Sequence, residues 1–154
     1  MRVGVATALV LGIWFAGSAT AAAPSPCKLV TVAEVKAAFG GTVATGKVDN
    51  SLPGAPTCHF AIKHSNLGMS GEAVVFITPG QSAATYKIAA KSIPGAVKVT
   101  GIATAAFYEP QTTAIELLKG NTVASAQAIF YPSPKGTKIK ADVIALAKAV
   151  AKHL

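Results

Sequence analysis

Acidic side chains and arginine are scarce in this chain. Its 154 residues include only six Asp and Glu side chains against fourteen Lys and Arg, and Arg2 is its sole arginine. Without further arginine the chain lacks the bidentate guanidinium fork that grips phosphate, and few aromatic residues interleave with the lysines for base stacking. We therefore predict no specific nucleic-acid partner. The lysine excess predicts a solvated surface with at most a weak attraction to anionic polymers.

Long apolar runs are also missing, apart from one at the N-terminus. Arg2 is followed by about 14 nearly unbroken apolar residues and then by the small residues Ala19-Thr20-Ala21. This order is typical of a secretory signal peptide, and the run is shorter than the roughly 20 residues that a membrane-spanning helix needs. We expect residues 1–21 to be cleaved, residues 22–26 to form a flexible lead-in, and no membrane span to remain. The protein is then predicted to be secreted or periplasmic, at the cell envelope.

Cysteine is limited to Cys27 and Cys58. In an exported protein an even pair is more often a disulfide than two free thiols. Two isolated cysteines without a neighbouring His pair are unusual metal ligands. We therefore predict a Cys27–Cys58 disulfide, which closes a loop of about 30 residues and should stabilise the fold by roughly 3–4 kcal/mol.

The remaining pattern predicts a single α+β domain over residues 27–154. A capping box, Thr31-Val32-Ala33-Glu34, begins a predicted helix over 32–39 that Gly40-Gly41 ends. Strands are predicted over 42–48, 57–63, 73–77, 96–100, 105–108, 112–118 and 122–131, and further helices over 81–92 and 140–153. The two last strands form a predicted hairpin. Helices at the start, middle and end of a series of strands favour an antiparallel sheet covered by an N-terminal, a middle and a C-terminal helix.

One segment resembles the phosphate-binding P-loop. Residues 41–47 carry its two glycines and its lysine, but Val48 stands where a Ser or Thr hydroxyl would bind magnesium. The P-loop also needs a strand before it and a helix after it, whereas here the predicted order is reversed. We therefore interpret these glycines as turn residues and predict no nucleotide and no other cofactor.

The three histidines do not form a metal-binding pattern. His59 and His64 are five residues apart on a predicted strand, so they face opposite sides of it, and no Asp or Glu lies within five positions of the pair. His153 is near the C-terminus of the last predicted helix, where a surface histidine is common. The sequence therefore predicts no metal site.

No catalytic motif is present in the sequence. Ser65, Ser70 and Ser82 lie near glycines, yet none of them sits in Gly-x-Ser-x-Gly. Glu34 is assigned to helix capping and Asp142 suits a first helical turn, so few carboxylates remain for a glycosidase pair. We therefore predict no catalytic residues and a protein that is not an enzyme. A small hydrolase with a site assembled from distant residues remains an alternative.

Several short stretches resemble a family of small exported proteins of unknown function from actinobacterial cell envelopes. They are Cys27-Lys28-Leu29-Val30-Thr31-Val32-Ala33-Glu34-Val35, Phe39-Gly40, Thr57-Cys58-His59-Phe60, the segment 101–108 and the closing helix. The resemblance implies a helix-covered antiparallel sheet, in part like the PsbP fold, and a non-catalytic role. Many such proteins are lipoproteins. Here Pro24-Ser25-Pro26 before Cys27 is not a lipobox, so that cysteine stays available for pairing.

These observations lead to one functional hypothesis and two alternatives. The first is an exported, non-enzymatic domain that binds a ligand or a protein partner at the cell envelope. The alternatives are a small secreted hydrolase and a cationic protein that adheres to anionic surfaces. An apolar cleft between the sheet and its helices would favour a small ligand, whereas a flat exposed patch would favour a protein partner.

Overall fold

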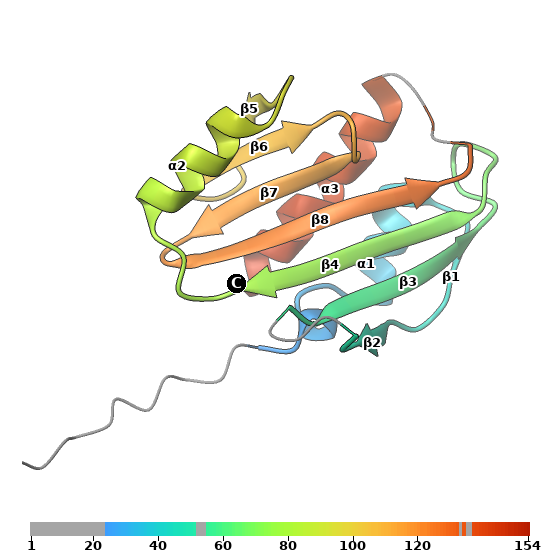
Figure 1. The fold of residues 1–154 in the computed structure, drawn as a ribbon. Coiled ribbons are helices and arrows are strands. Elements are labelled where there is room, and N and C mark those ends of the chain that lie inside the picture. The colour runs from blue at the N-terminus through green and yellow to red at the C-terminus, as the bar shows by residue number, and fades with distance from the viewer. Residues whose placement is uncertain (1–23, 52–54, 133, 135–136) are drawn as a thin grey trace, which may run out of the picture.

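The computed structural model describes residues 24–51, 55–132, 134 and 137–154. The predicted signal peptide, residues 1–21, lies outside these described residues. The described part of the chain forms one eight-stranded antiparallel sheet and three α-helices, which confirms the predicted α+β class (Figure 1). Within that part, no helix combines the length and the apolar character needed to cross a membrane.

The strand order places sequence-distant strands side by side. Neighbouring strands follow the order β1-β3-β4-β8-β7-β6-β5, and β2 also pairs with β3. The strands are β1 (Thr42–Val43), β2 (Lys47–Asp49), β3 (Thr57–Lys63), β4 (Gly71–Thr78), β5 (Val97–Val99), β6 (Ala105–Glu109), β7 (Ala114–Lys119) and β8 (Thr122–Phe130). The helices are the 3-10 helix η1 (Pro26–Lys28) and the α-helices α1 (Val32–Phe39), α2 (Ala83–Ser92) and α3 (Thr137–His153).

Several predicted boundaries differ from the structure, and α3 begins at Thr137 rather than at residue 140. Pro26, expected in a flexible lead-in, is buried and begins η1. The strand predicted over 42–48 is split into β1 and β2 around Gly46, where the chain passes close to the core. A Cβ atom at Gly46 would lie 2.7 Å from Cys58 Sγ and 2.7 Å from the ring of Phe60, so only glycine fits there without a shift of the neighbours.

The predicted capping box of α1 is present. Thr31 Oγ1 accepts a hydrogen bond from the Glu34 backbone N–H at 3.2 Å, and Glu34 Oε2 accepts one from the Thr31 backbone N–H at 2.8 Å. Glu34 Oε1 also lies 3.2 Å from His153 Nε2, which joins the start of α1 to the end of α3. Gly40, with φ of +70°, then ends α1 as predicted.

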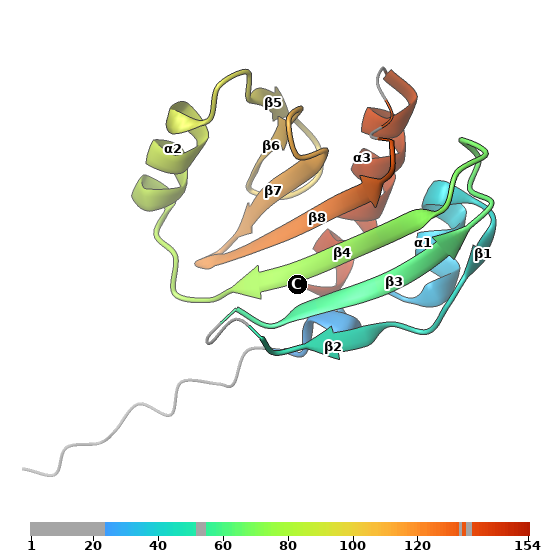
Figure 2. The same cartoon turned by 45° about the vertical axis from the view of Figure 1, so that its right-hand side comes forward.

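Helices α1 and α3 cover one face of the sheet, and α2 lies on the opposite face (Figure 2). Strand β8 presents Ala124, Ala126 and Ala128 to α3, and these small side chains allow the helix to pack closely. Buried side chains of α1 and α3 complete this main core, among them Phe39, Val143 and Leu146.

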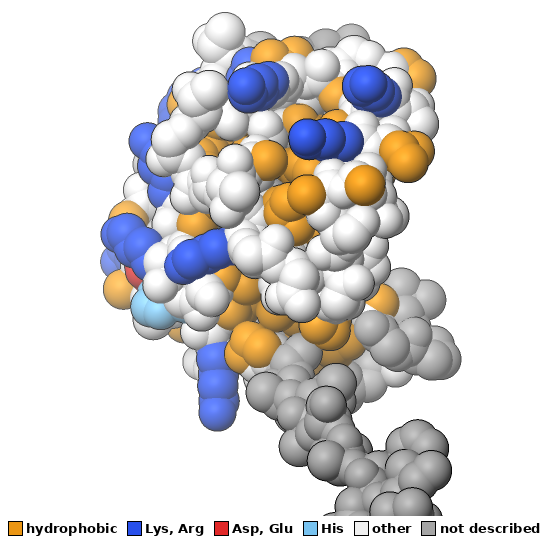
Figure 3. Space-filling view, turned by 90° about the vertical axis from the view of Figure 1, so that its left-hand side faces the viewer, with side chains coloured by type: hydrophobic (Ala, Val, Ile, Leu, Met, Phe, Trp, Pro, Cys, Tyr) orange, Lys and Arg blue, Asp and Glu red, His pale blue; other side chains and the backbone are white. Residues whose placement is uncertain are grey.

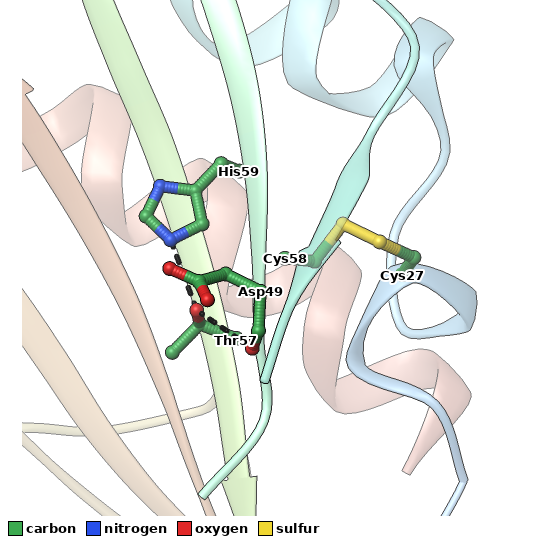
Figure 4. The surroundings of a disulfide bond; sticks show 5 residues. All are labelled: Cys27, Asp49, Thr57, Cys58 and His59. Atoms are coloured by element: carbon green, nitrogen blue, oxygen red, sulfur yellow. Dashed lines mark hydrogen bonds between the residues drawn. A yellow bond between two sulfur atoms is a disulfide. The ribbon is translucent and has the colours of Figure 1, made fainter. Parts of the chain in front are cut away.

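The predicted disulfide joins η1 to β3. Cys27 and Cys58 are bonded across 31 residues of sequence, with Cα atoms 5.0 Å apart, and Cys58 is buried in the main core. Because successive side chains of a strand point to opposite faces, the neighbouring His59 points away from the disulfide, as Figure 4 shows. The disulfide thus lies on the covered face, and His59 lies on the opposite, outer face.

Candidate functional site

Helix α2 stands over one part of the outer face and rests on it mainly through Tyr86. Tyr86 is the only buried residue of α2, whereas Ile88 on the same helix is 70% exposed. The Tyr86 ring lies 5.4 Å from that of Phe107 on β6, and its hydroxyl donates a 2.9 Å hydrogen bond to the Glu116 backbone carbonyl on β7. Tyr86 is therefore the main contact of the helix with the sheet, Ala90 and Ile93 pack partly against the same cluster, and space remains on both sides of Tyr86.

A cavity of about 320 Å³ lies on one side of Tyr86, between α2 and the sheet. We call it the Glu116 cavity. Its walls are mostly apolar or aromatic, with two carboxyl groups from neighbouring strands. The lining residues are Phe76, Thr78, Gln81, Thr85, Tyr86, Ala89, Ile93, Phe107, Glu109, Glu116 and Val123. Predominantly apolar walls with a few convergent polar groups are typical of small-molecule sites.

Glu116 is the most perturbed carboxyl group of this cavity. Burial beneath α2 raises the pKa of Glu116 from its usual 4.5 to about 7. The nearby Ser125 hydroxyl opposes this rise, while the negative charge of Glu109 adds to it. At neutral pH the Glu116 carboxyl group is therefore protonated in some molecules, where it can donate a hydrogen bond, and ionised in others. Carboxyl groups of binding and catalytic sites often have pKa values shifted in this way.

Ser125 lies beside Glu116 on the neighbouring strand. The two residues face each other across the β7–β8 pair, and Ser125 also faces Phe76 across the β4–β8 pair. Ser125 is fully buried, and its hydroxyl oxygen has no hydrogen-bond partner within the usual distance among the described residues. Ser125 does not line the Glu116 cavity itself, but its hydroxyl is close enough to Glu116 to favour the ionised carboxylate.

A second hollow, of about 610 Å³, lies on the other side of Tyr86. Its walls combine small apolar side chains with Lys87, Lys91 and Lys98, and no acidic side chain lines it. We call it the lysine groove. Figure 3, which views the α2 side of the molecule, shows lysine side chains standing around exposed hydrophobic ones. The two hollows beside Tyr86 thus differ in charge.

A hydrogen-bonded chain of Thr57, His59 and Glu72 crosses β3 and β4 on the outer face. Thr57 Oγ1 lies 2.9 Å from His59 Nε2, and His59 Nδ1 lies 3.0 Å from Glu72 Oε2 (Figure 4 shows Thr57 and His59). A hydroxyl, an imidazole and a carboxylate in this order resemble a hydrolytic triad. The His59 and Glu72 side chains are 34% and 47% exposed, and none of the three residues lines the Glu116 cavity or the lysine groove.

The other histidine and serine candidates have structural roles or lie apart. Ser65 accepts hydrogen bonds from two backbone N–H groups of its turn, and Ser82 caps the N-terminus of α2. Ser70 and His64 are exposed outside both hollows. In the described residues, no three His, Cys, Asp or Glu side chains are grouped as a metal site requires.

Comparisons of this chain with protein-family models, with curated proteins and with solved structures found no match. The resemblance to actinobacterial envelope proteins therefore stays a prediction.

Proposed function

We propose that this chain is an exported, non-catalytic binding domain that holds a small, largely apolar ligand in the Glu116 cavity. The observation that carries the proposal is the support of α2 by Tyr86, which leaves an apolar cleft between helix and sheet. Such a cleft favours a small ligand over a protein partner, because protein partners generally use flatter and larger surfaces. The disulfide accords with an oxidising, extracytoplasmic location.

The size of the cavity sets the size of the ligand. A volume of about 320 Å³ lies at the lower end of the usual range for ligand pockets, roughly 300–1,000 Å³. It suits a compact ring system better than a long chain. Because α2 is seated chiefly through one buried side chain, small movements of the helix can admit a ligand without disturbing the main core.

The experiment is a titration with N-phenyl-1-naphthylamine, a neutral dye that becomes fluorescent in apolar surroundings. We expect saturable binding of one dye per protein. Ala89→Phe places a ring into the cavity from α2 and should weaken binding by at least about tenfold, which corresponds to about 1.4 kcal/mol. Ala84→Phe is the matched control, since Ala84 is exposed on the same helix and lines neither hollow. Absence of saturable binding, or equal binding by both variants, would contradict the proposal.

The chain of Thr57, His59 and Glu72 supports a second candidate function, ester hydrolysis. In that reaction Thr57 Oγ1 attacks the ester carbonyl carbon, His59 Nε2 takes the hydroxyl proton and passes it to the departing alcohol, and water then releases the acyl group. Hydrolysis of p-nitrophenyl acetate that is lost in both Thr57→Val and His59→Gln would support it. Turnover that is unchanged in Thr57→Val would exclude it. We place this candidate second because Thr57 lines neither the Glu116 cavity nor the lysine groove.

A further inference from the structure

The two hollows beside Tyr86 are lined by side chains of opposite charge. The Glu116 cavity contains two of the chain's six acidic side chains, and none of the described lysines lines it. The chain as a whole carries a formal net charge of +8. The chain is strongly basic as a whole, whereas the charged side chains of this cavity are acidic. The two carboxylates therefore disfavour an anionic ligand in the cavity.

The floor of the cavity is arranged around Glu116. Glu109 and Glu116 lie on the paired strands β6 and β7, where Glu116 is opposite Phe107 and Glu109 is two residues further along. They are therefore diagonal neighbours on the same face, about 7–8 Å apart at the Cα atoms. Both carboxyl groups line the same space beneath α2, so a cation placed between them would interact favourably with each.

The walls are also suited to a positive charge. Phe76, Tyr86 and Phe107 line the cavity from β4, α2 and β6. The face of an aromatic ring carries partial negative charge and attracts ammonium groups, above all when water is excluded. Carboxylates surrounded by aromatic rings therefore form a more favourable site for an organic cation than for a metal ion, which would require more oxygen ligands.

The position of Glu116 also favours a positively charged ligand. Its carboxyl group is withdrawn from water beneath α2, and none of the described lysines lines the cavity. A buried carboxylate without a counter-charge is unfavourable. A ligand that brings a positive charge reduces this cost.

We propose that the ligand of the Glu116 cavity is a small aromatic or aliphatic organic cation, held between Glu109, Glu116 and the aromatic rings. This inference rests on the proposed binding function and assigns its ligand class. The other charged groups around the cavity belong to neighbouring elements: Lys87 and Lys91 of α2 and Lys98 of β5 line the lysine groove on the far side of Tyr86. The lysines thus lie on one side of Tyr86, and the two glutamates lie on the other.

The test compares three probes of similar size by NMR titration of the isotope-labelled protein, purified in its exported form. Phenyltrimethylammonium is the cation, tert-butylbenzene has the same shape without charge, and benzenesulfonate is an anion. At pH 8, where Glu116 is mostly ionised, we expect the cation to bind at least about tenfold more tightly than the neutral probe. The preference should decrease as the pH is lowered to 5.5, because Glu116 then becomes protonated.

Two variants test whether the preference for the cation over the neutral probe arises in this cavity. The double variant Glu109→Gln/Glu116→Gln keeps the shape of both side chains and should bind cation and neutral probe about equally. Asp49→Asn removes an exposed carboxylate elsewhere and should retain the preference of the unchanged protein. Because glutamine at position 116 is not penalised by burial of a charge, the double variant is expected to fold.

The outcomes separate the two proposals. If the neutral probe binds as tightly as the cation at pH 8, the cation inference is wrong while the binding function stands. If benzenesulfonate binds best, the ligand is anionic and the inference is overturned. If none of the three probes binds, and the neutral dye also fails, the binding function itself is wrong.

Discussion

Replacing Glu116 with glutamine should make the protein more stable at neutral and alkaline pH. Burial raises the pKa of this carboxyl group from 4.5 to about 7. In the unfolded chain Glu116 ionises near 4.5, whereas in the folded protein it stays protonated until about pH 7. The folded state therefore binds more protons between these values, and its stability must fall as the pH rises through this window.

The size of the effect follows from the two pKa values. One pKa unit corresponds to about 1.4 kcal/mol, so the full difference between 4.5 and about 7 corresponds to about 3 kcal/mol. The loss begins near pH 4.5 and is complete slightly above pH 7. Between pH 5 and pH 8 we expect the unchanged protein to lose about 2–3 kcal/mol relative to Glu116→Gln, whose amide does not titrate.

Urea unfolding of both proteins at pH 5, 6, 7 and 8 measures this difference. Taking the difference between the two proteins at each pH cancels the titration of all shared groups. Asp49→Asn is the control: hydrogen bonds with Ser51 lower the pKa of Asp49, so its contribution to stability is lost only in acid and stays constant over this range. A difference between Glu116→Gln and the unchanged protein that does not vary with pH would refute the reasoning.

Three further predictions concern the covered face. Gly46→Ala should reduce stability by about 1–3 kcal/mol, because the added Cβ meets Cys58 and the Phe60 ring at 2.7 Å; thermal unfolding checks this, and an unchanged melting temperature would contradict it. The double variant Cys27→Ser/Cys58→Ser should lose about 3–4 kcal/mol through the freed loop of 31 residues, and denaturant unfolding of the unchanged protein with added reductant should show the same loss. Thr31→Ala should cost about 1 kcal/mol, with Thr31→Ser as the variant that retains most of it.

Local elements of the fold were predictable because neighbouring residues encode them. The capping box of Thr31 and Glu34, the stop at Gly40 and the hairpin of β7 and β8 each depend on a few adjacent residues, and all three are present. The split between β1 and β2 was not predicted. It depends on the approach of Gly46 to Cys58, a contact that spacing along the chain does not reveal.

The candidate sites were much less predictable than the fold. No acidic residue lies within five positions of His59 in the sequence, yet β3–β4 pairing brings its ring within 3.0 Å of Glu72, thirteen residues away. No role was predicted for Glu116 from the sequence. A glutamate at the centre of the apolar run Ala114–Leu118 was the available signal, since a charged side chain there must either face solvent or lie in a site.

The sequence by itself determined the α+β class, the three helices, the cysteine pairing and the excess of positive charge, because these depend on composition and on short-range pattern. Only the tertiary structure decided that β8 lies between β4 and β7, which gathers Phe76, Ser125 and Glu116 on one face. It also decided that α2 covers Glu116 while resting on the sheet mainly through Tyr86. The physical reason is that removal from water, and with it the raised pKa of Glu116, depends on what packs over a group rather than on its neighbours in the chain.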